Sequence, residues 1–184
     1  VSIENRVKEL GRQAREASRV VAASTVATRN KALLAIRDAI ADNCNHLLAA
    51  NAQDVAAGAE TGLAPALLDR LELDADRIAS LMVSLEQVAG LPDPVGAIDG
   101  VRTMDSGIRV GKMRVPLGVI GIVYESRPNV TVEAASLCLK AGNAAILRGG
   151  SEAINSNLAL GRYIQEGLAA VGLPGEAIQV VGTT

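Results

Sequence analysis

Aromatic side chains are nearly absent from this 184-residue sequence, which has no Phe, no Trp and two Tyr, Tyr124 and Tyr163. This scarcity argues against the aromatic platforms on which many proteins stack unpaired nucleic-acid bases. The formal net charge is −2, so there is also no electrostatic case for binding nucleic acid or an anionic membrane. Hydrophobic residues make up 49% of the sequence, which is typical of a globular protein with a core of Ala, Leu, Val and Ile.

Long apolar segments are also lacking. No run approaches the roughly 18 residues that a membrane span needs, and residues 1–20 have mixed charge unlike a signal peptide.

We expect the two cysteines, Cys44 and Cys138, to be free thiols, and we therefore expect a cytoplasmic protein with no membrane partner. The single histidine, His46, has no second imidazole or Cys/Asp cluster to share a metal, so a solvated or hydrogen-bonded surface residue is favoured.

The first ninety residues have the apolar spacing of helices. Hydrophobic residues recur every three or four positions in three stretches, which predict helices at residues 3–22, from Ser24 or Thr25 to about residue 57, and from a cap at Asp74 to about residue 89. A shorter helix with Pro65 in its first turn is expected between the last two. Residues 1–99 are therefore predicted to form a helical region that packs on a following domain.

A β segment is predicted at residues 100–116. Ile108 and Val110 alternate with Arg109, and the alternation slips at Gly111-Lys112 before it resumes. A one-residue slip at a glycine indicates a β-bulge or a tight turn.

Residues 117–184 alternate strand and helix signals. Apolar runs at 117–124 and 144–147 predict two strands, the first buried on both faces, and helices are expected after each. A third strand begins near Ile178, where it would lie at an exposed sheet edge. The pattern predicts an α/β fold: an incomplete doubly wound, Rossmann-like parallel sheet with right-handed crossovers, preceded by the helical region.

Polar residues follow the first two strands of this predicted sheet. The first loop contains Ser126, Arg127 and Asn129, and the second runs from Arg148 to Ser151. The carboxyl ends of parallel strands are where open α/β sheets bind ligands, and arginine side chains and helix N-termini suit anions. The sequence therefore favours an anion- or nucleotide-binding site, with ordinary polar turns as the alternative.

The same region resembles a known family. The segments VPLGVIGIVYESRPNVT and AASLCLKAGNAAILRGGSEA are similar to the signature region of the γ-glutamyl phosphate reductase (glutamate-5-semialdehyde dehydrogenase) family, in the aldehyde dehydrogenase superfamily. The resemblance implies NADPH-dependent reduction of L-glutamate 5-phosphate to L-glutamate 5-semialdehyde and phosphate, in proline biosynthesis. It also implies that the nucleophilic cysteine lies in a downstream catalytic domain outside these residues. The 184-residue chain alone is accordingly expected to be inactive.

The resemblance assigns roles to residues of both loops. Asn129 matches the oxyanion donor of the superfamily, whereas Arg127 and Ser126 are expected to bind the anionic substrate. The expected cofactor-binding residues for NADP are Arg148, Gly149, Gly150 and Ser151. Cys138 lies within an apolar helix and is not expected to be the nucleophile.

The resemblance also implies partners. Strands in the position of residues 100–116 contribute to oligomerisation in the superfamily, so a homo-oligomer is expected, with a plain solvent-facing surface as the alternative. Association with glutamate 5-kinase is a further expectation from the pathway. Two other functions stay open: another NAD(P)-dependent aldehyde or acyl-phosphate dehydrogenase, and a non-catalytic nucleotide-binding fragment.

Overall fold

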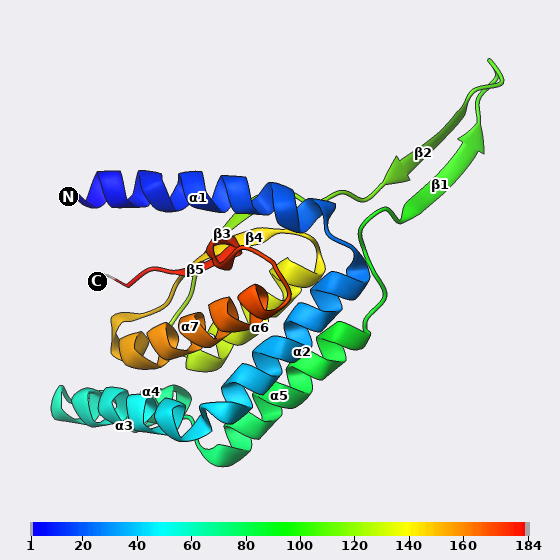
Figure 1. Cartoon of the computed structure of the whole chain (residues 1–184). Coiled ribbons are helices and arrows are strands. Elements are labelled where there is room, and N and C mark those ends of the chain that lie inside the picture. Colours follow the sequence, from blue (N-terminus) through cyan, green and yellow to red (C-terminus); the bar gives the residue numbers. More distant parts are fainter. Residues whose placement is uncertain (1, 183–184) are drawn as a thin grey trace.

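In a computed structural model, which describes residues 2–182, five helices precede a projecting hairpin and a small parallel sheet (Figure 1). The helices are α1 (Ile3–Ala23), α2 (Val26–Asp42), α3 (Cys44–Glu60), α4 (Pro65–Leu71), α5 (Ala75–Gly90), α6 (Pro128–Lys140) and α7 (Ile154–Ala170). The strands are β1 (Ile98–Thr103), β2 (Arg109–Met113), β3 (Val119–Val123), β4 (Ala144–Arg148) and β5 (Ile178–Val180). Two 3₁₀ turns, η1 (Ser151–Ala153) and η2 (Gly175–Ala177), precede α7 and β5.

The parallel sheet has the order β3-β4-β5 and lies between helices. Helix α1 covers one face, whereas α6 and α7 cover the other, and α2 and α5 form an outer layer (Figure 1). The core joins these layers through aliphatic residues, among them Ile36, Leu147 and Leu160. The predicted α/β fold with an N-terminal helical region is confirmed.

The predicted helix from residue 25 to about residue 57 was wrong, because the chain divides it into α2 and α3 at Asn43. The Asn43 side chain donates a hydrogen bond to the Ala39 carbonyl over 2.9 Å, and its backbone N–H also binds that carbonyl. An asparagine that binds the preceding turn in this way competes with helix continuation. The apolar spacing continues through this break, so it did not reveal the change of direction. Thr25 and Asp74, in contrast, are N-caps as predicted.

The prediction that the first strand is buried on both faces was also wrong. β3 is an edge strand. Val123 at its end is 77% exposed, and Leu117, which precedes the strand, is 81% exposed. β5 lies at the opposite edge, as expected for the third strand, but Ile178 and Gln179 are buried. Gln179 donates a hydrogen bond to the Leu10 carbonyl of α1, the helix that covers one face of the sheet.

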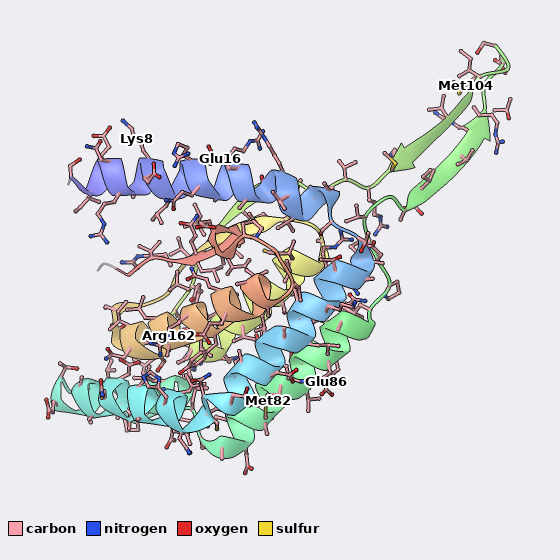
Figure 2. The ribbon with its side chains drawn as sticks, in the orientation of Figure 1. Lys8, Glu16, Met82, Glu86, Met104 and Arg162 are labelled. Atoms are coloured by element: carbon pink, nitrogen blue, oxygen red, sulfur yellow. The ribbon has the colours of Figure 1, made fainter. Side chains whose placement is uncertain are left out.

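Strands β1 and β2 form an antiparallel hairpin, which we call the arm (residues 98–113), whose residues are all exposed. It projects from the body of the molecule, and Met104 lies near its tip (Figure 2). The register shifts between Asp99 and Arg102, so an extra residue lies opposite Gly111. The predicted slip is therefore a bulge, with the additional residue on the partner strand.

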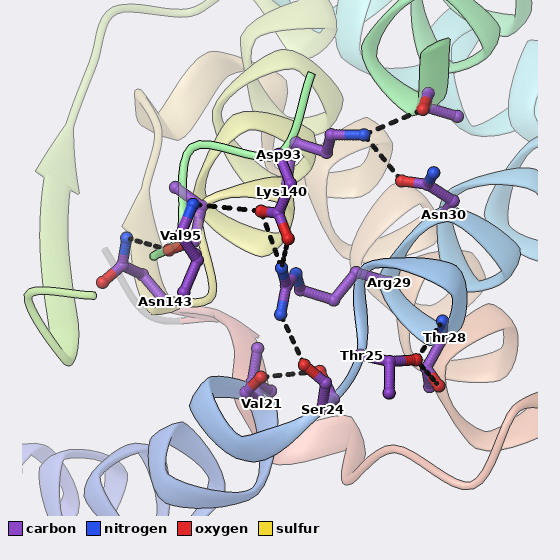
Figure 3. A network of polar contacts seen from close by, with 12 residues as sticks. Val21, Ser24, Thr25, Thr28, Arg29, Asn30, Asp93, Val95, Lys140 and Asn143 are labelled. Atoms are coloured by element: carbon purple, nitrogen blue, oxygen red, sulfur yellow. Dashed lines mark hydrogen bonds and ion pairs between the residues drawn. The ribbon is translucent and has the colours of Figure 1, made fainter. Parts of the chain in front are cut away.

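A buried polar network anchors the connector between α5 and the arm (Figure 3). Arg29 of α2 is 1% exposed, and one of its terminal nitrogens lies 2.8 Å from both carboxylate oxygens of Asp93. Its other terminal nitrogen donates to the Ser24 carbonyl over 2.6 Å. Nearby, the Lys140 ammonium at the end of α6 donates to Asn30 and to the Ala89 carbonyl, and burial lowers the pKa of this lysine. The network joins α2, α5, α6 and the arm connector.

Several smaller predictions can also be compared with the structure. Cys44 and Cys138 are free thiols, and His46 is an exposed residue whose Nδ1 lies 2.7 Å from the Tyr163 hydroxyl, as expected. None of the helices in residues 2–182 is both long and apolar enough to cross a membrane. Over the same residues, no group of three or more His, Cys, Asp or Glu side chains is arranged to hold a metal ion.

Candidate active site

The candidate site lies where β3 and β4 end. The two strands are parallel and in register, Val123 opposite Arg148, so the loops that follow them lie at the same edge of the sheet. Two cavities occur here, of about 400 Å³ and about 330 Å³. We call them the first and the second cavity, and α4 contributes residues to both.

The first cavity contains Arg127, the last residue of the loop after β3, and Asn129, the second residue of α6. Its other walls come from α4, α5 and the segment between them, and from α6: Asp69, Arg70, Glu72, Leu73, Arg77, Ser80, Leu81 and Glu133. Pro128 is the first residue of α6, a position that needs no backbone N–H, so Asn129 lies in the first helical turn.

Asn129 presents an amide donor at the first cavity. Its side-chain nitrogen donates one hydrogen bond to Glu133, one helical turn later, over 3.1 Å. An amide nitrogen carries two donors, so the second N–H remains for an acceptor in the cavity. The arrangement therefore suits the oxyanion role expected for this residue, with Glu133 orienting the amide.

Arg127 and Arg70 flank a single carboxylate. Arg127 Nε lies 2.9 Å from Glu125 Oε1, but the angle does not make a hydrogen bond, and this buried nitrogen has no hydrogen-bond partner among the described residues. Arg70 Nη1 lies 3.5 Å from the other oxygen of Glu125. Both guanidinium groups therefore keep donors for an anionic ligand.

The second cavity contains Ser126, Arg148, Gly150 and Ser151, together with Arg70, Glu125, Glu152 and leucines of α4 and of the turn before it. Ser126 was expected to bind substrate, but it lies with the cofactor candidates rather than with Arg127 and Asn129. Its hydroxyl donates to Glu152, and this hydrogen bond holds the pKa of Glu152 below its usual range. A charged carboxylate therefore shares this cavity with Arg148.

The two glycines have a packing role in the structure. A Cβ on Gly149 would lie 3.0 Å from the Tyr124 ring and closer still to Asn157, and one on Gly150 would lie 3.0 Å from the Ser126 backbone nitrogen. Gly149 lies outside the residues that line either cavity, whereas Gly150 lines the second. Their identity is thus explained by the close approach of the two loops.

Helix α3 positions both α7 and α4 through two buried polar residues. Asp54 accepts hydrogen bonds from the backbone N–H groups of Asn155 and Ser156, which caps the start of α7 from outside. Asn51 donates to the Leu71 carbonyl and accepts from the Leu73 N–H, which fixes the end of α4. Asn51 shares the buried face of α3 with Leu47, and a polar residue on an apolar helix face is a sequence signal that it satisfies backbone groups.

Cys138 lines neither cavity. It lies within α6 and is 7% exposed, and burial raises the pKa of its thiol. A raised pKa leaves less thiolate, which is the nucleophilic form. That Cys138 is not the nucleophile stays a prediction, which its burial supports.

Comparisons with known proteins give a consistent match. The sequence profile of the aldehyde dehydrogenase family matches residues 2–184. The solved γ-glutamyl phosphate reductase of Thermotoga maritima is 40% identical with a TM-score of 0.91, over 96% of this chain and 42% of that one. The γ-glutamyl phosphate reductase of Saccharomyces cerevisiae is 32% identical with a TM-score of 0.89, over 95% of this chain and 46% of that one.

A more distant structure shares the fold alone. An acetylating aldehyde dehydrogenase from Geobacillus thermoglucosidasius is 15% identical, with a TM-score of 0.67 over 97% of this chain and 37% of that one. In all three comparisons the present chain spans less than half of the other protein's length.

Proposed function

The chain belongs to the aldehyde dehydrogenase family, and from this premise we propose that the full-length protein reduces L-glutamate 5-phosphate to L-glutamate 5-semialdehyde and phosphate with NADPH. The observation that carries the proposal is the first cavity, where an amide donor, Asn129, and an arginine with free donors, Arg127, line the same space. The similarity to two γ-glutamyl phosphate reductases supports the same substrate.

The residues of the first cavity can stabilise the negative charge that develops during this reaction and bind the anionic group of the substrate. Attack of a thiolate on an acyl phosphate places negative charge on the carbonyl oxygen, and a preorganised N–H donor stabilises that charge. The second N–H of Asn129 is available for this oxygen, and Arg127 is available for the phosphate or the carboxylate of the substrate. We propose that the thiolate comes from outside residues 2–182, because Cys138 is buried and neither Cys138 nor Cys44 lines either cavity.

The second cavity supports a nicotinamide cofactor, which would supply the hydride. Arg148 and Ser151 line it with a guanidinium and a neutral hydroxyl, and such groups tolerate a ribose 2′-phosphate. Glu152 adds a negative charge to the same cavity. The preference for NADP over NAD therefore rests on Arg148.

Replacing Arg148 with methionine should raise the KM for NADPH by about tenfold, the size expected for losing one charge-assisted hydrogen bond. The KM for NADH should change less, because that cofactor lacks the 2′-phosphate. Steady-state kinetics of the full-length protein with each cofactor measure both values. Arg19→Met, on the exposed face of α1, is the matched control. Equal effects on NADPH and NADH would show that Arg148 does not select the phosphate.

The reaction itself is tested in the oxidative direction. The full-length protein, given L-glutamate 5-semialdehyde and NADP⁺, should form NADPH only when inorganic phosphate is added. Turnover without phosphate would instead identify a non-phosphorylating aldehyde dehydrogenase. Cofactor binding without turnover in either direction would identify a nucleotide-binding module.

We also propose a homo-oligomer that assembles through the arm. Three of its apolar residues, Ile98, Ile108 and Met113, are more than half exposed, which is unusual for a stable hairpin in solution. A cytoplasmic location is favoured by the two free thiols.

Association with glutamate 5-kinase is proposed from the substrate's chemistry alone, since an acyl phosphate must be supplied by a phosphoryl transfer to a carboxylate.

A further inference from the structure

Arg70 of α4 lies at the boundary between the two cavities and lines both of them. Its sequence neighbours gave no sign of this position, because α4 is separated from the strand-end loops by more than fifty residues. The position results from the packing of α4 over the loop that follows β3, where Arg70 reaches Glu125.

The backbone that carries Arg70 is fixed on both sides. Asn51, which is buried, donates to the Leu71 carbonyl over 2.8 Å and accepts from the Leu73 N–H over 2.7 Å. From α5, Arg77 donates to the Glu72 carbonyl over 2.8 Å and to the Asp69 carboxylate over 2.7 Å. A side chain on such a backbone loses little further freedom when it binds a ligand.

The guanidinium of Arg70, in contrast, is not committed to the fold. Its side chain is 47% exposed, and its contact with Glu125 is long at 3.5 Å. Arg77, the neighbouring arginine in the first cavity, has its terminal nitrogens bound to Asp69 and Glu72. Glu125 therefore faces two guanidinium groups, those of Arg70 and Arg127, which leaves one positive charge unbalanced within this group of three.

We propose that Arg70 is a specificity-determining residue that, together with Arg127, binds an anionic end of the substrate in the first cavity. The ligand chemistry is a phosphate or carboxylate group, whose oxygens match the planar fork of a guanidinium. Glu125 keeps the two arginines close to each other before the substrate arrives. The inference rests on the proposed function, because it takes the substrate to be the anionic acyl phosphate.

Arg70→Met in the full-length protein tests this role. The KM for inorganic phosphate or for L-glutamate 5-semialdehyde should rise by about 10- to 100-fold, the loss expected for hydrogen bonds to a charged group. The KM for NADP⁺ and the melting temperature should stay at the wild-type values, and Arg70→Lys should recover part of the loss. A merely structural role would instead lower stability and would not separate the three KM values.

The two substrate KM values together identify the anion that Arg70 binds. A rise confined to phosphate assigns Arg70 to the phosphoryl group, and a rise confined to the semialdehyde assigns it to the carboxylate. Changes no larger than those in the Arg19→Met control would overturn the proposal while leaving the reductase function intact.

A failure of the proposed function has a different signature. If the wild-type protein shows no phosphate-dependent turnover, calorimetric titrations of wild type and Arg70→Met with inorganic phosphate and with L-glutamate decide the question. Binding of either probe that weakens at least tenfold in Arg70→Met supports the anion site. Equal binding, or no binding to either protein, overturns it.

Discussion

Replacing Asn129 with alanine should lower the kcat of the full-length protein by about 100- to 1000-fold, because removal of one oxyanion donor has costs of this size. The KM values should change little, since the donor acts on charge that develops after binding. Asn129 is half-buried in the first turn of α6 and bonds only to Glu133 among the described residues, so the fold should survive. Steady-state kinetics and a melting curve measure the two effects separately.

Glu133→Gln is the matched control for that experiment. The amide oxygen of glutamine can still accept the Asn129 hydrogen bond, so the orientation of the donor should persist and kcat should fall by less than about tenfold. A kcat for Asn129→Ala within tenfold of the wild-type value would show that Asn129 is not the oxyanion donor. The first cavity would then have no assigned group to stabilise the carbonyl oxygen.

Replacing Arg29 with methionine should lower the free energy of unfolding by about 3 kcal/mol, because it leaves a partly buried carboxylate without its partner. Arg29 is 1% exposed and joins Asp93 to the Ser24 carbonyl (Figure 3). For a protein of this size the melting temperature should fall by roughly 6–12 °C. Urea denaturation and a thermal melt measure both values.

Arg37→Met on the same helix provides the comparison. Arg37 pairs with Asp38 and Glu86, and these partners are largely exposed, so the loss should be below about 1 kcal/mol. Equal losses for the two variants would show that the Arg29 network is no stronger than a surface ion pair.

The sequence predicted those elements whose signals are local. Thr25 and Asp74 cap helices because a single side chain can satisfy a free N–H, and this chemistry is visible in the sequence. The break at Asn43 could not be predicted in this way, since the apolar spacing runs through it. The exposure of β3 depends on which strands pair with it, and an apolar run alone does not report its neighbours.

The same distinction applies to the residues of the candidate site. Arg127, Asn129, Arg148 and Ser151 could be found because they follow strands, and the edge of a parallel sheet gathers such residues. Arg70 and Glu133 could not, because one lies on a distant helix and the other resembles any exposed helical glutamate. Their positions follow from packing between elements, which a single sequence does not specify.

Helix α6 has an additional consequence as a mechanical element. It carries Asn129 in its first turn and Lys140 in its last, so a rod of 13 residues, about 20 Å long, connects the cavity to the polar network beside the arm connector. A helix of this length transmits tilt with little bending. Any displacement at the root of the arm that rotates α6 would therefore also redirect the Asn129 amide, so the proposed assembly through the arm would be coupled to the geometry of the candidate site.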